Sequence, residues 1–180
     1  MEKMYNCGMV VGRFSPIHLG HEKLINLALK KCKRVVVVVT YNDLKDENNP
    51  FDIEFKLYLI RKIYEKEIIE NKLILLPFHD TRIIDNEYGN RLLKIVSEKL
   101  LSNVDYIVYG DDKDINKCFS SEVSAKFFKQ KINRKELQIS ATKIRKLLQS
   151  DNDEELKKYI NSILYSDILT MKKHLKRTFV

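Results

Sequence analysis

Five consecutive valines, Val35–Val39, constrain the fold of this 180-residue chain more than any other stretch. β-Branched side chains favour an extended backbone, and a run without polar alternation is apolar on both sides of a strand. A strand of this kind is buried on both faces, as in parallel sheets whose crossover helices cover both sides. We therefore predict an α/β fold with helices on both faces of its sheet.

The rest of the chain alternates strand-like and helix-like segments. Four apolar runs predict strands at Tyr5–Val11, Arg34–Thr40, Leu73–Pro77 and Tyr106–Tyr109, and a short fifth strand is expected at Lys126–Phe128. Helical spacing places two apolar sets on one face each: Ile53, Leu57, Ile60, Tyr64 and Ile68, and Leu92, Leu93, Val96, Leu100 and Leu101. The pattern predicts a Rossmann-like, doubly wound parallel sheet of about five strands.

Length and composition predict one main domain. At 180 residues with 44% hydrophobic content, the chain can bury one sizeable core. From Asp151 the sequence becomes rich in Asp, Glu, Lys and Asn and then helical in pattern. We expect an α/β core over residues 1–150 and a C-terminal helical extension over residues 151–180, packed on that core.

Cysteine usage and hydropathy favour a cytoplasmic location. Cys7, Cys32 and Cys118 are odd in number, widely spaced and set in or beside apolar runs, so we interpret them as reduced core thiols. The residues before the first strand are short and polar, unlike a signal peptide. The longest apolar run, Val35–Val39, is too short to span a bilayer, and no membrane partner is expected.

The formal net charge of +8 raises the question of nucleic-acid binding. Its densest clusters, 30–34 and 172–177, lie where helices are expected to end, so their cations complement the carbonyl ends of the helix dipoles. No basic strand carries interleaved aromatic residues. We therefore expect small phosphorylated ligands and no nucleic acid, with a homo-oligomer left open.

The segment Gly12–His21, Gly-Arg-Phe-Ser-Pro-Ile-His-Leu-Gly-His, joins the first predicted strand to a helix. Its glycines permit tight turns and close approach of a ligand, and the first amides of a helix attract anions. If the helix begins near Leu19, His18 and His21 share one face beside that anion site. Imidazoles so placed can stabilise negative charge on a phosphate, with Arg13 close by.

A second polar segment, Ile139–Arg145, reads Ile-Ser-Ala-Thr-Lys-Ile-Arg and enters another predicted helix. Ser140 or Thr142 is expected to be its N-cap. Hydroxyl groups, helix amides and Arg145 would then converge on one point. The two segments together predict chemistry on a nucleotide polyphosphate.

Further polar residues follow the predicted strands. Asn42 follows the valine strand, His79 and Asp80 follow the third strand, and Gly110 and Asp111 follow the fourth. Ligands of parallel α/β sheets bind outside the carboxyl ends of the strands, so one cleft is expected to collect these groups. Gly110 would allow close approach of a base or ribose, and the adjacent carboxylates, Asp111 or Asp112, would accept hydrogen bonds from it.

These motifs resemble those of the HxGH superfamily of nucleotidyltransferases. His18–His21 matches the signature, and Ile139–Arg145 matches its ISxTxxR partner. Within the superfamily the chain most resembles the archaeal-type nicotinamide-mononucleotide adenylyltransferases. Their GRFxPxHxGH motif matches Gly12–His21, their NPFxxxER motif is half matched by Asn49–Lys56, and a late strand motif is echoed by Val108–Asp112.

The resemblance implies transfer of AMP from ATP to a mononucleotide phosphate, with Mg²⁺ accompanying the ATP and no dedicated protein metal site. It assigns His18, His21 and Arg13 to catalysis. It assigns Ser140, Thr142 and Arg145 to the β- and γ-phosphates. Five further residues are expected to bind ATP: Gly12, Phe14, Gly20, Gly110 and Asp111. Four are expected to bind the acceptor: Asn42, His79, Asp80 and Tyr88.

The chain departs from the subfamily pattern at two points, which leaves other acceptors open. It has no Trp to stack on the pyridine ring, for which Tyr88 is the expected replacement, and Lys56 stands where the family has arginine. A polyol-phosphate cytidylyltransferase, a pantetheine-phosphate adenylyltransferase and a non-catalytic nucleotide-binding regulator are the alternatives. The preference between nicotinamide and nicotinate is open as well.

Overall fold

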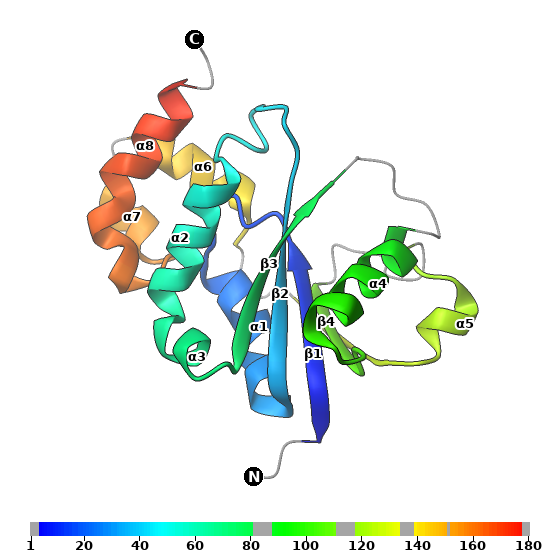
Figure 1. Cartoon of the computed structure of the whole chain (residues 1–180). Helices are drawn as coiled ribbons and strands as arrows, with labels where there is room; N and C mark the ends of the chain where they lie inside the picture. The colour runs from blue at the N-terminus through cyan, green and yellow to red at the C-terminus, as the bar shows by residue number, and fades with distance from the viewer. Residues whose placement is uncertain (1–3, 81–87, 111–117, 134–138, 151, 178–180) are drawn as a thin grey trace.

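The computed structural model of the chain describes residues 4–80, 88–110, 118–133, 139–150 and 152–177. Within them, five parallel strands form one sheet in the order β3-β2-β1-β4-β5 (Figure 1). The strands are β1 (Tyr5–Gly12), β2 (Cys32–Tyr41), β3 (Leu73–His79), β4 (Tyr106–Gly110) and β5 (Phe128–Ile132). This order confirms the predicted doubly wound fold.

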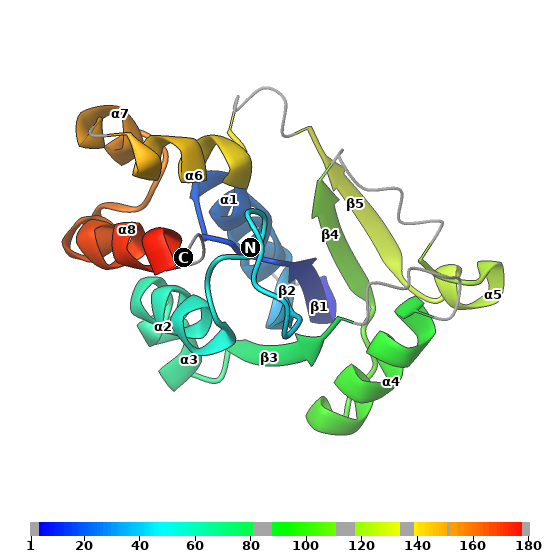
Figure 2. The ribbon, with the colours of Figure 1, turned by 90° about the horizontal axis from the view of Figure 1, so that it is seen from above.

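Helices cover both faces of the sheet. In Figure 2, α4 lies on one side, and α1, α2, α6 and α8 lie on the other. The helices are α1 (Leu19–Lys31), α2 (Ile53–Ile63), α3 (Glu65–Ile69), α4 (Tyr88–Leu100), α5 (Ser121–Ser124), α6 (Ala141–Gln149), α7 (Asp153–Lys157) and α8 (Ile168–Arg177), with the 3-10 helix η3 at Ser162–Asp167. Among the described residues, no helix is long and apolar enough to cross a membrane.

The valine strand is buried on both faces, as predicted. Val35, Val37 and Val39 join the hydrophobic cluster under α1, α2 and α6, whereas Val36 and Val38 join the cluster under α4. All five side chains are fully buried. Successive strand residues point to opposite sides of a sheet, so a single run supplies both cores.

The C-terminal helices pack on the α1 side of the molecule. Leu156, Leu164 and Met171 belong to the same hydrophobic cluster as Val39. The amide of Leu19, at the start of α1, donates to a carbonyl of this region at 3.0 Å. The division of the chain into a core and an extension at residue 150 stays a prediction.

The ends of two predicted helices differ from the structure. The helix expected to run from Ile53 to Ile68 breaks at Tyr64, whose backbone leaves helical angles (φ −114°, ψ 27°). The buried Tyr64 ring docks beside α1, where its hydroxyl donates to Asn26 at 3.1 Å. Leu101, predicted to lie on the apolar face of a helix with Leu100, has a left-handed φ of 50° just past α4 and is 93% exposed.

The fifth strand begins two residues later than predicted, at Phe128. Phe127 instead lies in the turn after α5, where its ring packs edge-on against Phe119 at 5.0 Å. The basic cluster at 30–34 is also divided, because Lys30 and Lys31 end α1 whereas residues 33–34 already belong to β2.

The cysteine interpretation agrees with the structure. Cys7 and Cys32 are buried, Cys118 is half-buried, and none of the three forms a disulfide. Burial raises the pKa of Cys7 to about 11, with the nearby Asp105 carboxylate adding to the effect. A thiol with so high a pKa stays protonated at neutral pH and is a poor nucleophile.

Candidate functional site at the carboxyl ends of the strands

His18 is the N-cap of α1. Its Nδ1 accepts a hydrogen bond from the amide of Gly20 at 3.1 Å, and the side chain is fully buried. A backbone N–H can only donate, so Nδ1 is the unprotonated nitrogen, and neutral His18 carries its proton on Nε2. The helix cap thereby makes Nε2 a hydrogen-bond donor.

The two histidines of the first motif lie face to face. The ring of His21 stacks on that of His18 with centroids 3.9 Å apart, and Phe14 packs at 4.7 Å from His21. Phe14 is buried and has a left-handed φ of 47°, whereas none of the described glycines has a positive φ. The prediction that the histidines share one face is confirmed, and the turn angle expected of glycine belongs to Phe14.

Glycine is required here for space. A Cβ atom on Gly12 would lie 3.1 Å from the Phe14 ring. A Cβ atom on Gly20 would lie 3.0 Å from His18 Nδ1 and 3.0 Å from a methyl group of Ile139. Because Ile139 opens the second motif, Gly20 is a point of close contact between the two motifs.

The first amides of α1, where an anion site was expected, are already hydrogen-bonded within the protein. Leu19 N donates to the carbonyl of Tyr159 at 3.0 Å, and Gly20 N donates to His18. The next amide, of His21, donates to the His18 carbonyl at 2.8 Å. The C-terminal region and the His18 side chain therefore use the donors that an anion would need.

The start of α6 is better suited to an anion. Ser140 is its N-cap, and its Oγ accepts from Lys143 N at 3.2 Å, which selects Ser140 over Thr142. In a helix capped this way, the amides of Ala141 and Thr142 precede the first intrahelical hydrogen bond and point along the axis. These two amides and the exposed Thr142 hydroxyl form a compact set of donors.

Arg145 connects this helix to the first motif. Its Nη1 donates to the carbonyl of Ser15 at 2.9 Å, and its Nη2 donates to Asn48 Oδ1 at 2.9 Å and to Thr142 Oγ1 at 3.2 Å. The side chain is buried. Burial lowers the pKa of Arg145, and the positive charge of Arg13 lowers it further. The site thus holds two guanidinium groups close enough to repel each other.

Lys56 adds a third cation. It is fully buried, and its Nζ donates to the carbonyl of Thr40 at 3.3 Å and to Asn49 Oδ1. Burial lowers the pKa of Lys56 to about 8, and Arg13 contributes to the shift. Thr40 in turn donates to the carbonyl of Gly12 at 3.3 Å. These bonds place the lysine at the carboxyl ends of β1 and β2.

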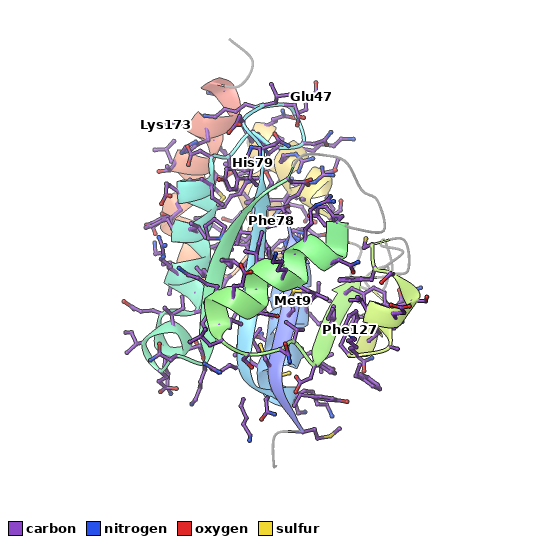
Figure 3. All side chains as sticks on the ribbon, turned by 45° about the vertical axis from the view of Figure 1, so that its right-hand side comes forward. Met9, Glu47, Phe78, His79, Phe127 and Lys173 are labelled. Atoms are coloured by element: carbon purple, nitrogen blue, oxygen red, sulfur yellow. The ribbon has the colours of Figure 1, made fainter. Side chains whose placement is uncertain are left out.

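The predicted acceptor residues lie at the same edge of the sheet. Figure 3 shows Phe78 and His79 at the end of β3, toward the loop that carries Glu47. His79 Nε2 lies 3.0 Å from Asp43 Oδ2, and the amide of Asp80 donates to the carbonyl of Tyr41 at 2.6 Å. His79 and Asp80 therefore lie at the carboxyl end of β2 as well as at that of β3.

Asn42 and Tyr88 complete this group. Asn42 Oδ1 accepts from Asn49 at 3.5 Å, which joins it to Lys56. Tyr88, the first residue of α4, packs edge-on against Phe78 at 5.7 Å. Burial raises the pKa of Tyr88, and so does the nearby Asp80 carboxylate, whereas Arg13 opposes the shift. Tyr88 thus lies within electrostatic reach of both the predicted catalytic and the predicted acceptor residues.

Gly110 ends β4, which is the direct neighbour of β1 in the sheet. In a doubly wound sheet the chain switches direction between these two strands, and the crevice outside their carboxyl ends is the usual ligand site. Asp111 and Asp112 lie outside the described residues.

Two residues of this site were missed by sequence reasoning. Asn48 holds Arg145, and Thr40 joins Lys56 to Gly12. Asn48 directly precedes the half-matched motif Asn49–Lys56, which was the available signal. For Thr40, the only signal in the sequence was its position at the end of the valine strand.

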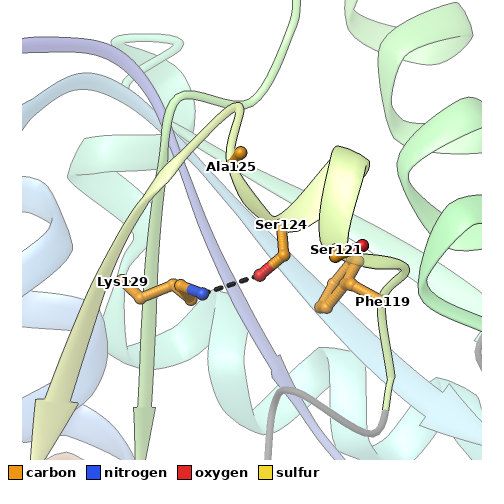
Figure 4. Close-up of a pocket in the computed structure, with 5 residues that line it drawn as sticks. All are labelled: Phe119, Ser121, Ser124, Ala125 and Lys129. Atoms are coloured by element: carbon orange, nitrogen blue, oxygen red, sulfur yellow. Dashed lines mark hydrogen bonds between the residues drawn. The ribbon is translucent and has the colours of Figure 1, made fainter.

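A pocket elsewhere on the surface contains none of the predicted site residues. It lies between α5 and β5, where Lys129 donates to Ser124 Oγ at 2.6 Å (Figure 4). Its lining residues are Phe119, Ser121, Ser124, Ala125 and Lys129. The candidate site is instead the group of residues that these contacts bring together at the carboxyl ends of the strands.

Known proteins share this fold and sequence pattern. The nicotinamide-nucleotide adenylyltransferase of Sulfurisphaera tokodaii is 28% identical over 167 residues, which cover 89% of each chain. That of Thermococcus kodakarensis is 30% identical over 79 residues, 43% of this chain and 42% of that protein, so this match spans less than half of the relative's length.

A solved structure with the same fold is the bifunctional NMN adenylyltransferase/ADP ribose pyrophosphatase from Francisella tularensis, complexed with AMP and a manganese ion. It superposes with a TM-score of 0.74 at 20% identity, covering 97% of this chain and 52% of that one. Residues 9–147, which include both motifs, the second half of β1 and all of β2 to β5, match the cytidylyltransferase-like family. With its stacked HxGH histidines joined to the ISxTxxR helix, the chain belongs to the cytidylyltransferase-like family of nucleotidyltransferases.

Proposed function

We propose that this protein transfers AMP from ATP to nicotinamide mononucleotide or nicotinate mononucleotide, forming the dinucleotide and pyrophosphate. One observation carries the proposal: Arg145 binds the carbonyl of Ser15, which brings the start of α6 to the stacked pair His18 and His21. The relatives from Sulfurisphaera tokodaii and Thermococcus kodakarensis, both named for this reaction, support the choice of acceptor.

The proposed reaction is a direct displacement. An oxygen of the acceptor phosphate attacks the α-phosphorus of ATP, the bond from that phosphorus to the bridging oxygen breaks, and pyrophosphate leaves. The attacking oxygen is already anionic, so no carboxylate base is needed. The protein acts by positioning the two phosphates and by stabilising the charge that develops between them.

His18 is the best-defined group for that task. Its Nε2–H is a donor because Nδ1 caps α1, and its ring is held between the helix start and His21. We assign both imidazoles to the oxygens of the reacting α-phosphate, with Arg13 beside them. Donors fixed before the reaction stabilise developing charge without reorganisation.

The start of α6 would hold the departing pyrophosphate. The amides of Ala141 and Thr142, the Ser140 and Thr142 side chains and Arg145 supply neutral and charged donors around one point. Gly12, Phe14, Gly20, Gly110 and Asp111 are assigned to the rest of the nucleotide. The close contact of Gly20 with Ile139 supports a shared site for the two motifs.

The acceptor is assigned to the crevice between β2, β3 and α4. Asn42, His79, Asp80 and Tyr88 would line it, with the Tyr88 ring stacking on the pyridine. Lys56 and Arg13 would attract the acceptor phosphate. Mg²⁺ is assigned to the phosphates of ATP, because this ion keeps several waters and commonly binds through substrate phosphate oxygens.

Pyrophosphate release tests the proposal. The purified protein is incubated with Mg²⁺, with ATP or CTP, and with each of nicotinamide mononucleotide, nicotinate mononucleotide, phosphopantetheine and a polyol phosphate. We expect a signal with ATP and a pyridine mononucleotide only. Activity confined to another pair would reassign the acceptor within the family, and silence across the panel would favour a nucleotide-binding regulator.

Turnover of Tyr88→Leu and Tyr88→Phe would then test the stacking assignment. A raised KM for the mononucleotide in the leucine variant, with the phenylalanine variant close to wild type, supports a ring stack. An unchanged KM in both variants removes Tyr88 from the acceptor site.

A further inference from the structure

The hydrogen bonds of Arg145 leave its guanidinium poorly available to a phosphate. A guanidinium can grip a phosphate with two parallel bonds along either of two edges, Nη1 with Nη2 or Nε with Nη2. Both edges need Nη2. The two hydrogens of Nη2 are engaged with Asn48 Oδ1 at 2.9 Å and Thr142 Oγ1 at 3.2 Å. A two-bond grip on a phosphate therefore requires one of these partners to leave.

Asn48 is the partner that can leave. Thr142 lies one turn before Arg145 on the same helix, and the Nη1 partner is the main chain of Ser15. Asn48, by contrast, is exposed and lies in the loop between β2 and α2. The loop has its own internal bonds, from Asn48 N to Asp46 Oδ1 at 2.8 Å and from Asn49 N to the Asp46 carbonyl at 3.0 Å. It can keep its turn when the side chain of Asn48 is released.

We propose that Asn48 is a positioning residue whose side-chain oxygen occupies the phosphate position on Arg145 until ATP displaces it. The inference rests on the proposed function, since it takes the ATP phosphates to be the incoming ligand of Arg145. The exchange is favourable because a neutral amide oxygen gives way to a charged one, and hydrogen bonds between charged partners are about twice as strong.

Charges on the same loop assist the exchange. The carboxylates of Asp46 and Glu47 act on Arg145 and favour its charged form. A triphosphate beside Arg145 would repel both carboxylates, so the loop and the nucleotide compete for the same guanidinium. ATP binding and movement of this loop are therefore coupled.

Displacement of Asn48 is also expected to affect the residues assigned to the acceptor. Asn49, the next residue, accepts a hydrogen bond from Lys56 and donates to Asn42. Release of Asn48 therefore frees the residue directly before Asn49, whose side chain holds the buried cation of Lys56. ATP is thereby expected to bind first and to prepare the acceptor site.

Calorimetric titration with ATP and Mg²⁺, without any acceptor, tests the proposal. Asn48→Ala removes the competitor and is expected to tighten ATP binding by about three- to ten-fold, the range of a single net hydrogen bond. Asn48→Asp replaces the amide with a carboxylate that pairs with Arg145, and is expected to weaken binding by about ten-fold. A purely structural role for Asn48 would weaken binding in both variants, and that result would overturn the proposal.

Two controls separate the competition from other effects. In an Arg145→Ala background, Asn48→Ala should leave the dissociation constant for ATP unchanged, because the interaction it competes with is gone. Asn103→Asp adds the same charge at an exposed position just before β4, at the opposite end of the sheet, and should not change ATP binding. A full effect of Asn48→Ala in the Arg145→Ala background would contradict the proposal.

Failure of the inference and failure of the proposed function give different results. If the wild-type protein does not bind ATP, the proposed function is wrong and the inference falls with it. If the wild type binds ATP and Asn48→Ala binds it equally well or less well, only the inference is wrong. Melting temperatures of all variants confirm that each one is folded.

Discussion

Arg145 donates a hydrogen bond of 2.9 Å to the main-chain carbonyl of Ser15, which lies 130 residues earlier in the chain. This single contact joins the turn after β1 to the start of α6. The side chain is buried, and its Nη2 also reaches Asn48 and Thr142. The two motifs are therefore held together before any nucleotide arrives, which reduces the reorganisation that binding would require.

Arg145→Lys is expected to raise the KM for ATP by at least about ten-fold and to lower the melting temperature. Lysine has a single nitrogen, which cannot serve three acceptors in the plane of a guanidinium fork. Steady-state kinetics and thermal unfolding measure the two effects. Lys146→Ala, at the exposed neighbouring position on α6, is the matched control. A lysine variant with wild-type KM would show that the fork geometry is not used for ATP.

His18 has two roles that substitution can separate. Asparagine is a good N-cap, so His18→Asn should keep the stability of α1 while losing the Nε2–H donor and lowering kcat by about two orders of magnitude. His18→Ala should lower kcat by the same factor and should also lower the free energy of unfolding by about 1 kcal/mol. Urea unfolding measures the stability of each variant, and steady-state kinetics measures its kcat. Equal stability of the two variants would mean that the cap contributes nothing.

His21→Ala is expected to lower kcat by about two to three orders of magnitude, as for the loss of one preorganised donor to a developing oxyanion. ATP binding should survive, because the β- and γ-phosphates are assigned to the start of α6 and Arg145. Single-turnover kinetics and ATP titration measure the two quantities. His174→Ala on α8, which removes another ring-stacked histidine, is the control. An unchanged rate in His21→Ala would exclude this imidazole from the mechanism.

Lys56 should make stability depend on pH in the alkaline range. Its folded pKa of about 8 lies below the ordinary 10.5, so between these values the unfolded chain binds more protons than the folded one. The contribution of Lys56 to stability therefore rises with pH across this window, and its full shift amounts to roughly 3 kcal/mol. Below pH 8 the buried charge reduces stability by the whole amount.

Lys56→Met removes this titration. Urea unfolding between pH 7.5 and about 10.5 should show a slope of stability against pH that is more positive in the wild type than in the variant, because methionine carries no proton while Cys7 and the other titrating groups contribute equally to both. Lys66→Met, at an exposed position on α3, should retain the wild-type slope. Parallel curves for wild type and Lys56→Met would place the pKa of Lys56 near its ordinary value.

Periodicity predicted the sheet well because it depends on neighbours in the chain. The run Val35–Val39 is a strand buried on both faces, and α1 begins at Leu19, the start that the interpretation of His18 and His21 assumed. Periodicity failed where a tertiary contact overrode it. Tyr64 interrupts a helix by docking on α1, and Leu101 leaves its helix in a left-handed conformation.

The sequence by itself determined the class of the fold, the two motifs and the family of the reaction they imply, since local pattern and residue type carry that information. Only the tertiary structure decided which donors are available. In the folded protein the first amides of α1 donate to His18 and Tyr159, and neutral His18 carries its proton on Nε2. Arg145 donates to Ser15 and Asn48. The partners of Arg145 lie 130 and 97 residues away, and no local pattern encodes a hydrogen bond across such a distance.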